Sequence, residues 1–318
     1  MITYLALIAG LVILVVAGDL LVRGAVGMAE RLGIPALIIG LTVVAFGTSA
    51  PELVVSMEAA ASGAFGLAIG NVVGSNIANI LLVLGAPSLI YATACSGPGT
   101  RRNALFMVAV TLGFIALAGD GELGRLDGVV MIALLGVFLY DNYRSARRHR
   151  KQAQDALADE FGDIGTKPPA LLGAFLVVGL IGLPLGANLT IYGATEIARS
   201  WGVSETAIGL TIVAIGTSLP ELVASIMAAC QRQSAVAVGN VIGSNIFNLL
   251  AIMGTTSLVF PLAVPAEIFM PDMWIMVLTS LALLPFIFFC KPITRPIGAI
   301  MVLLFGAYVV GVLYTHGF

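Results

Sequence analysis

The chain has 318 residues, of which 59% are hydrophobic and only 10% are charged, and its formal net charge is -2. A soluble domain carries about 25% charged residues, so this composition excludes an ordinary soluble protein and predicts an integral membrane protein. The apolar runs are about 20 residues long and continuous rather than alternating, which favours membrane-spanning helices over the strands of a barrel. The three cysteines lie far apart without paired spacing, so they indicate neither a disulfide framework nor a zinc site.

Ten membrane spans are predicted along the chain. They lie near residues 2–25, 34–61, 67–91, 103–119, 125–143, 170–198, 203–230, 235–260, 272–290 and 295–314. The first lacks the basic region that precedes the apolar core of a cleaved signal peptide, so we interpret it as a span.

One strongly polar stretch, Arg144 to Lys167, separates five spans from five. A segment of about 25 residues cannot bury a core of its own, so we expect a solvated linker rather than a folded ion-sensing domain. The predicted organisation is a first five-helix repeat over 1–143, a linker over 144–169 and a second five-helix repeat over 170–318.

The distribution of Lys and Arg predicts the orientation of the spans. Thirteen of the 15 basic residues fall in the loops on one side, and only Arg125 and Arg199 fall on the other. Because basic loops stay in the cytoplasm, we expect a cytoplasmic linker and two extracytoplasmic termini, in a multi-pass protein of the cell's inner membrane.

The two halves of the chain repeat each other. Residues 40–85 align with 209–254 at a constant offset of 169 residues, with 26 identities in 46 positions. Each unit contains an odd number of spans, so the second copy enters the membrane from the opposite side. The predicted fold is therefore an all-α membrane protein of ten helices in two inverted five-helix repeats. Secondary transporters of this architecture place a substrate site near the midplane between the halves, although a channel could also be built in this way.

Each copy carries the motif Gly-Thr-Ser-x-Pro-Glu-Leu, at residues 47–53 and 216–222. The next span of each copy carries Gly-Ser-Asn-Ile-x-Asn, at residues 74–79 and 243–248. A proline inside an apolar span removes a backbone donor, so each motif helix is expected to break or kink near its proline. The break frees backbone carbonyls at membrane depth, which is tolerated where they line a cavity or bind a ligand.

Four polar side chains of the motifs are predicted to meet between the halves: Glu52, Glu221, Asn79 and Asn248. With hydroxyls and carbonyls around them, they form an oxygen-only ligand set that suits a hard cation, calcium in particular. Two glutamates would balance the charge of one divalent or two monovalent ions. Without an ion the two carboxylates repel each other, so we expect the empty site not to switch readily between the two sides of the membrane, which is the basis for exchange. A purely structural role as hydrogen-bonding groups between helices is disfavoured, because two ionisable residues occupy equivalent intramembrane positions.

Two other acidic residues are weaker candidates for ion transport. Glu58 lies six residues from Glu52 and therefore turns to another helix face, and Met227 stands at its repeat position. Asp19 is expected to pair with Arg23, which lies one helical turn away.

At these motifs the sequence resembles the calcium/cation antiporter superfamily, and within it the sodium/calcium-exchanger branch with its small bacterial members. The doubled GTSxPEL with the doubled GSNIxN is a specific signal, and the resemblance covers the whole chain. It implies a secondary active antiporter that exchanges calcium for a monovalent cation by alternating access, with sodium as the first expectation. The calcium-site candidates that it implies are Glu52, Glu221, Thr48, Thr217, Asn79 and Asn248, and the sodium-site candidates are Ser49, Ser75, Ser218 and Ser244.

One departure from the family pattern bears on the coupling ion. Many sodium/calcium exchangers carry Asp where this chain has Asn248, so the core has one carboxylate fewer. Proton or potassium coupling therefore stays open beside sodium, and a passive cation channel is a more distant alternative. The chain has no phosphate-binding loop motif, no HExxH and no Ser–His or Cys–His pair at membrane depth, so neither a primary pump nor an intramembrane enzyme is predicted. No organic cofactor and no nucleic-acid partner is indicated.

Overall fold

The computed structural model describes residues 2–157, 168–202, 214–266 and 268–316. Its elements in chain order are α1 (Ile2–Leu32), α2 (Ala36–Ile39), η1 (Gly40–Val44), α3 (Ala45–Thr48), α4 (Ala50–Ala61), α5 (Phe65–Ala78), η2 (Asn79–Val83), α6 (Gly85–Ile90), α7 (Thr100–Leu117), η3 (Ala118–Asp120), β1 (Glu122–Leu123), α8 (Arg125–Leu157), α9 (Pro169–Ser200), α11 (Ala214–Thr217), α12 (Leu219–Cys230), α13 (Ser234–Phe247), η5 (Asn248–Met253), α14 (Gly254–Val259), β2 (Leu262–Ala263), η6 (Ile268–Asp272), α15 (Met273–Phe288) and α16 (Arg295–His316). The strands β1 and β2 pair antiparallel over two residues each, and the other regular elements of these ranges are helical. The chain is therefore an all-helical protein, as its continuous apolar runs predict.

Eight helices in the described part are long and apolar enough to cross a membrane, and all eight coincide with predicted spans. They are Thr3–Leu32, Phe65–Ile90, Thr100–Asp120, Arg125–His149, Pro169–Ser200, Ser234–Val259, Ile268–Phe288 and Arg295–Tyr314. The predicted span 34–61 is present as two helices, Ala36–Thr48 and Ala50–Ala61, bent by 43°. The remaining predicted span, 203–230, lies partly outside the described residues, and its described part contains the apolar helix Leu219–Cys230.

Helix α8 runs past the predicted end of its span. It continues from Arg125 to Leu157, so residues 144–157 are helical where the sequence analysis expects a linker. The reason is local, because no Gly or Pro interrupts the chain between Gly136 and Gly162 and the segment is rich in Ala, Arg, Lys and Gln, which favour helix. The rest of the polar stretch, residues 158–167, lies outside the described residues.

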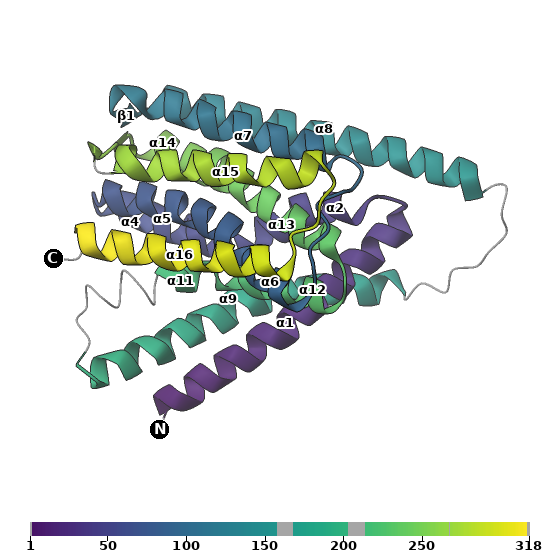
Figure 1. The fold of residues 1–318 in the computed structure, drawn as a ribbon, viewed down its shortest axis with the longest axis horizontal. Coiled ribbons are helices and arrows are strands. Elements are labelled where there is room, and N and C mark those ends of the chain that lie inside the picture. The colour runs from purple at the N-terminus through teal and green to yellow at the C-terminus, as the bar shows by residue number, and fades with distance from the viewer. Residues whose placement is uncertain (1, 158–167, 203–213, 267, 317–318) are drawn as a thin grey trace.

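Most long helices run along the long axis of the molecule, whereas α1 and α9 cross them obliquely as a pair (Figure 1). These two helices pack backbone to backbone through glycines. An added Cβ at Gly193 would lie 2.7 Å from Leu7 N, and one at Gly10 would lie 2.6 Å from Thr190 N. Small residues permit such close approach inside a membrane, where helix association depends on van der Waals contact rather than on removal of apolar surface from water.

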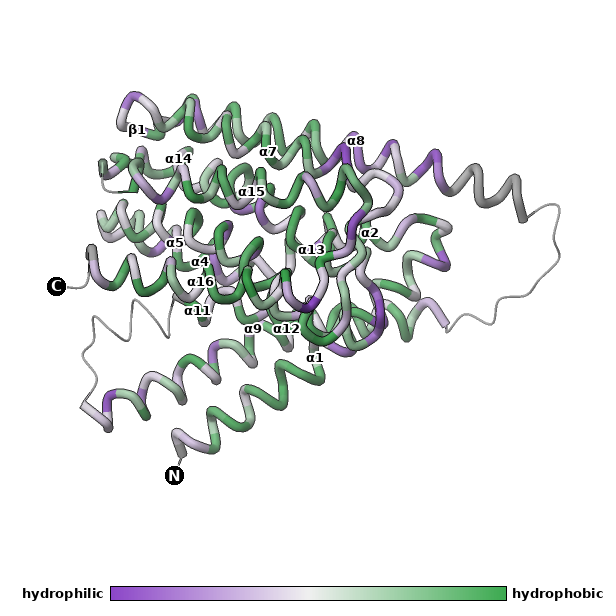
Figure 2. The backbone as a smooth tube through the Cα atoms, in the orientation of Figure 1, coloured by the Kyte–Doolittle hydropathy of each residue, from purple (hydrophilic) through white to green (hydrophobic). Residues whose placement is uncertain are grey.

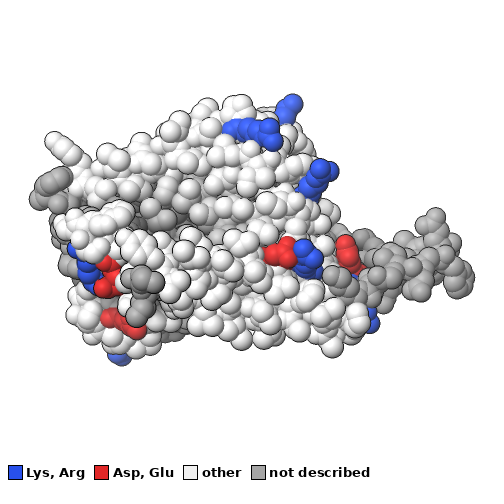
Figure 3. All heavy atoms as spheres, turned by 90° about the horizontal axis from the view of Figure 1, so that it is seen from below, with Lys and Arg blue, Asp and Glu red and all other residues white. Residues whose placement is uncertain are grey.

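Hydropathy and charge divide the molecule into an apolar middle and two more polar ends. The long helices are mostly green along their length in Figure 2, and purple segments gather near their ends. On the face drawn in Figure 3, the charged side chains lie toward the two ends and a broad white area separates them. Asp19 forms the predicted ion pair with Arg23, at 2.8 Å. This distribution of charge is that of a multi-pass membrane protein.

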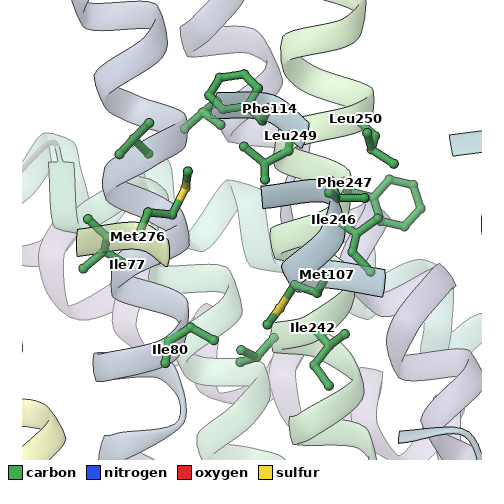
Figure 4. Packing of buried hydrophobic residues seen from close by; sticks show 14 of the residues in the cluster. Ile77, Ile80, Met107, Phe114, Ile242, Ile246, Phe247, Leu249, Leu250 and Met276 are labelled. Atoms are coloured by element: carbon green, nitrogen blue, oxygen red, sulfur yellow. The ribbon is translucent and has the colours of Figure 1, made fainter. Parts of the chain in front are cut away.

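The centre of the molecule is packed from both halves of the chain. Ile77 of α5, Ile246 of α13 and Met276 of α15 belong to one cluster of buried side chains, drawn in Figure 4. In the span Ser234–Val259, 94% of the most apolar window is buried, compared with 11% in Arg295–Tyr314. The helix that carries the second Gly-Ser-Asn-Ile-x-Asn motif is therefore central, and α16 is peripheral.

Candidate functional site

Each Gly-Thr-Ser-x-Pro motif interrupts a helix, as the sequence predicts. Ser49 separates α3 from α4, and Ser218 separates α11 from α12. Their backbone ψ angles are 4° and 6°, outside the helical range. The proline in the first turn of each following helix has no N–H, so the carbonyl four residues earlier loses its helical donor.

These breaks place Glu52 in the first turn of α4 and Glu221 in the first turn of α12. The partial positive charge at a helix N-terminus favours a carboxylate at this position. Both side chains are buried, with 1% and 0% exposure. Ser49 Oγ of the other half donates to Glu221 Oε1 at 3.2 Å. The second oxygens, Glu52 Oε2 and Glu221 Oε2, are buried and have no hydrogen-bond partner in the described structure, so the pair requires a cation or a proton.

Asn79 and Asn248 lie where α5 and α13 widen into single π-helical turns, η2 and η5. Such turns inside α-helices are frequent at functional sites. Each amide donates across the two halves: Asn79 Nδ2 to Asn245 Oδ1 and Asn248 Nδ2 to Asn76 Oδ1, both at 3.0 Å. The amide oxygens of Asn79 and Asn248 are buried without a hydrogen-bond partner in the described structure. These two oxygens are therefore available to a cation.

All ten residues predicted for the site are buried in the described structure. They are Thr48, Ser49, Glu52, Ser75, Asn79, Thr217, Ser218, Glu221, Ser244 and Asn248. Ser218 Oγ donates to Ser75 Oγ at 3.4 Å, and Thr48 Oγ1 donates to Asn240 Oδ1 at 3.3 Å. Ser244 Oγ is a further buried oxygen without a partner among the described residues. Side chains from both halves thus interlock around the two glutamates.

Asn71 and Asn240 complete the site and were not predicted from the sequence. Asn71 Nδ2 donates to the backbone carbonyl of Glu52 at 3.3 Å and to Ser56 Oγ at 3.0 Å, which holds the first turn of α4 on α5. Asn240 makes the same two bonds to the repeat-equivalent atoms of α12, at 3.3 and 3.2 Å. The signal that could have identified both residues is the repeat, since they lie at identical positions of the two copies.

The polar side chains of the candidate site offer oxygen atoms as potential ligands. Among the described residues, no group of three or more His, Cys, Asp and Glu side chains could hold a metal ion. The buried oxygens without a partner at the site are Glu52 Oε2, Glu221 Oε2, Asn79 Oδ1, Asn248 Oδ1 and Ser244 Oγ. Carboxylate, amide and hydroxyl oxygens are the donors that Ca²⁺ takes in sets of about six to eight. The arrangement can bind and release a hard cation whose charge the two carboxylates balance.

Comparison with known proteins gives consistent results over the whole chain. A family model described as sodium/calcium exchanger protein matches residues 2–143 and 171–314. The chain is 32% identical to the sodium/calcium exchanger MaX1 of Methanosarcina acetivorans, in an alignment that covers 98% of the chain and 99% of that protein. It is 35% identical to the inner membrane protein YrbG of Escherichia coli, with 96% and 94% covered. A solved structure of the sodium-calcium exchanger NCX_Mj, soaked with 2.5 mM Na+ and 0.1 mM Ca2+, is similar with a TM-score of 0.84, 30% identity and 98% of each chain covered.

Proposed function

The chain belongs to the sodium/calcium exchanger family, and on this premise we propose that it exchanges calcium for sodium by alternating access. Calcium/cation antiport is the activity of the family, and the protein is a transporter rather than an enzyme. The observation that carries the proposal is the set of buried oxygens without partners on Glu52, Glu221, Asn79, Asn248 and Ser244. Buried polar atoms are normally satisfied, so five of them in the interlocked motifs support a bound cation as their partner.

The proposed ligands follow from the two motifs. Two carboxylates and two amide oxygens, together with backbone oxygens near the motif threonines, would hold calcium, and the motif hydroxyls would hold sodium. The calcium ligands are then Glu52, Glu221, Asn79 and Asn248 with Thr48 and Thr217, and the sodium ligands are Ser49, Ser75, Ser218 and Ser244. The burial of all ten residues supports a site that is closed to water on binding, where oxygen ligands replace the hydration shell of the ion.

The proposed topology has ten spans in two inverted repeats, with 1–143 and 170–318 as the two halves and 144–169 as a cytoplasmic linker. Both termini then lie outside the cytoplasm, in the inner membrane. Two observations support this topology. With the spans predicted from the sequence, thirteen of the 15 basic residues fall on one side of the membrane, and hydrogen bonds of the first motif recur in the second at an offset of 169 residues.

The charge of the site supports exchange rather than free passage. Two buried carboxylates without a cation carry a large desolvation penalty. The protein should therefore switch between the states open to either side of the membrane only when calcium, sodium or protons occupy the site. The same argument leaves the counter-ion to experiment, because Asn248 removes one carboxylate from the pattern of many sodium/calcium exchangers. Potassium and protons are the alternatives to sodium, and a passive cation channel is the remaining one.

Calcium-45 uptake into proteoliposomes tests the proposal directly. Purified protein is reconstituted, and an outward gradient of sodium, potassium or protons is imposed, one at a time, at fixed external calcium. We expect uptake that requires the outward sodium gradient and stops when it is collapsed. Uptake driven only by potassium or only by protons would show that this ion, and not sodium, is the counter-ion. Uptake that does not depend on any of the three gradients would contradict antiport.

A further inference from the structure

Asn76 and Asn245, one from each half, form a closed ring of two reciprocal hydrogen bonds from side-chain amide to backbone carbonyl, and this ring accepts one hydrogen bond each from Asn79 and Asn248. Asn76 Nδ2 donates to Asn245 O at 3.4 Å, and Asn245 Nδ2 donates to Asn76 O at 3.3 Å. The oxygens of these two amides accept from the site asparagines, Asn76 Oδ1 from Asn248 and Asn245 Oδ1 from Asn79, each at 3.0 Å. All four side chains are at most 1% exposed, so water does not complete their hydrogen bonds.

These hydrogen bonds fix the orientation of each amide, because an amide has a donor end and an acceptor end. Asn76 uses its nitrogen on a backbone carbonyl and on Met276 Sδ, at 3.5 Å, so its oxygen is the atom that faces Asn248. Asn248 must then present its nitrogen to Asn76 and its oxygen to the opposite side. Reversal of the Asn248 amide would bring two oxygens to about hydrogen-bond distance without a hydrogen between them and would turn an N–H toward the site.

The atoms without partners agree with this orientation in both halves. Asn248 Oδ1 and Asn79 Oδ1 are both buried without a hydrogen-bond partner in the described structure, and each belongs to a residue whose nitrogen is held by the ring. Asn142 on α8 shows the same pattern outside the site, so an open oxygen alone does not identify a ligand. At Asn79 and Asn248 the open oxygens belong to the motif that recurs together with the two glutamates, and only the oxygen end of an amide can be a cation ligand.

We propose that Asn76 and Asn245 are positioning residues that orient the amides of Asn248 and Asn79, so that oxygen rather than nitrogen faces the transported cation. The inference rests on the proposed function and deepens it. Each positioning residue acts on the opposite half of the chain, so one half sets the orientation of the ligand that the other half contributes. The ring thereby joins the two halves at the site and determines its affinity for a cation.

The first test replaces each positioning amide by an apolar side chain of similar size. In Asn76→Leu and in Asn245→Leu, the amide of Asn248 or of Asn79 loses its acceptor and is free to turn. We expect each variant to raise the KM for calcium by about tenfold, the effect of losing one contact between an amide oxygen and the cation. The maximal rate should fall by less than the affinity, because the ring does not itself contact the ion.

A buried amide outside the ring is the matched control. Asn142 on α8 is 1% exposed and donates to Asn103 Oδ1 at 3.3 Å and to Phe138 O at 3.0 Å. Asn142→Leu makes the same chemical change and should leave the KM for calcium unchanged. An equal rise in KM in the Asn142 variant would overturn the proposal.

A double-mutant cycle distinguishes positioning from general support of the fold. When Asn248 is changed to Ser, no amide remains for Asn76 to orient, so adding Asn76→Leu should raise the KM by less than about twofold. In the Asn79→Ser background, Asn76→Leu should keep its full effect. The same tenfold rise in both backgrounds would contradict the proposal. A wild-type protein without gradient-driven calcium uptake would instead contradict the proposed function, so the two failures are distinguishable.

Discussion

The two copies of the Gly-Ser-Asn-Ile-x-Asn helix, α5 and α13, carry nearly the same polar residues but have different neighbours. On α13, an added Cβ at Gly243 would lie 2.5 Å from Leu41 O, because this helix packs backbone to backbone against η1 of the first half. On α5, an added Cβ at the equivalent Gly74 would have no described atom within 4 Å. The most apolar window of the span is 94% buried in the second copy and 72% buried in the first.

This difference shows that a repeated sequence conserves the ligands of the site but not the packing around them. Both glutamates are buried to the same degree, whereas Gly239 and Gly243 are packed against backbone and their equivalents Gly70 and Gly74 are not. Alternating access requires such an inequality between otherwise equivalent halves.

The largest expected effect tests whether the two copies contribute equally to the site. Glu52→Gln and Glu221→Gln each remove one of the two charges that balance calcium, so each should lower calcium uptake by about 100-fold or more. Uptake of calcium-45 into proteoliposomes measures this. Glu58→Gln, at an exposed position of the same helix as Glu52, should keep wild-type uptake. Uptake close to the wild type in either site variant would reduce that carboxylate to a packing role.

The second prediction addresses the unequal packing directly. Gly243→Ala should destabilise the protein by about 2 kcal/mol, because the added methyl must displace backbone, whereas Gly74→Ala should change stability by less than about 0.5 kcal/mol. Thermal unfolding in detergent, followed by tryptophan fluorescence, measures both. Equal losses of stability in the two variants would show that the two helices have equivalent neighbours in solution.

The third prediction concerns the residue at which the chain departs from the family pattern. Asn248→Asp adds a carboxylate to the site and removes the N–H that Asn248 donates to Asn76. We expect it to change the dependence of calcium uptake on the sodium gradient, with a melting temperature within a few degrees of the wild type. Asn79→Asp makes the same change in the other copy and provides the comparison. An unchanged ion dependence in both variants would mean that this position does not determine coupling.

The smallest expected effect concerns the hydrogen bonds that hold the glutamate helices. Ser56→Ala removes the hydroxyl that accepts a hydrogen bond from Asn71, and Ser225→Ala removes the one that accepts from Asn240. Each change should lower the free energy of unfolding by about 1 kcal/mol. The KM for calcium should rise a few-fold, and by the same factor in both variants if the copies are equivalent at this level. Ser62→Ala, whose hydroxyl donates only to a carbonyl of its own helix, should have no effect on KM. A larger change in one site variant than in the other would extend the inequality of the two copies to the site itself.

Much of the fold could be predicted from the sequence because its causes are local. Apolar runs of membrane length predict eight helices that the structure describes as candidate spans, and each Ser-x-Pro segment predicts the break at Ser49 and at Ser218. The helical conformation of residues 144–157 was not predicted, since charge alone gave no sign that helix-forming residues continue α8 to Leu157. Polarity predicts exposure to water but does not end a helix, for which Gly, Pro or a cap is required.

For the candidate site too, some features follow from the sequence and others only from the tertiary structure. From the sequence by itself, the doubled motifs and their resemblance to exchanger motifs predicted ten side chains for the site, because polar groups in an apolar chain stand out and recur at an offset of 169 residues; all ten are buried in the described structure. Only the tertiary structure decided that Asn240 bonds to Thr48 across 192 residues, that the ring turns the oxygens of Asn79 and Asn248 outward, and that α13 is closed where α5 is open. These features depend on distances between atoms that are far apart in the chain, and no local pattern of residues encodes them.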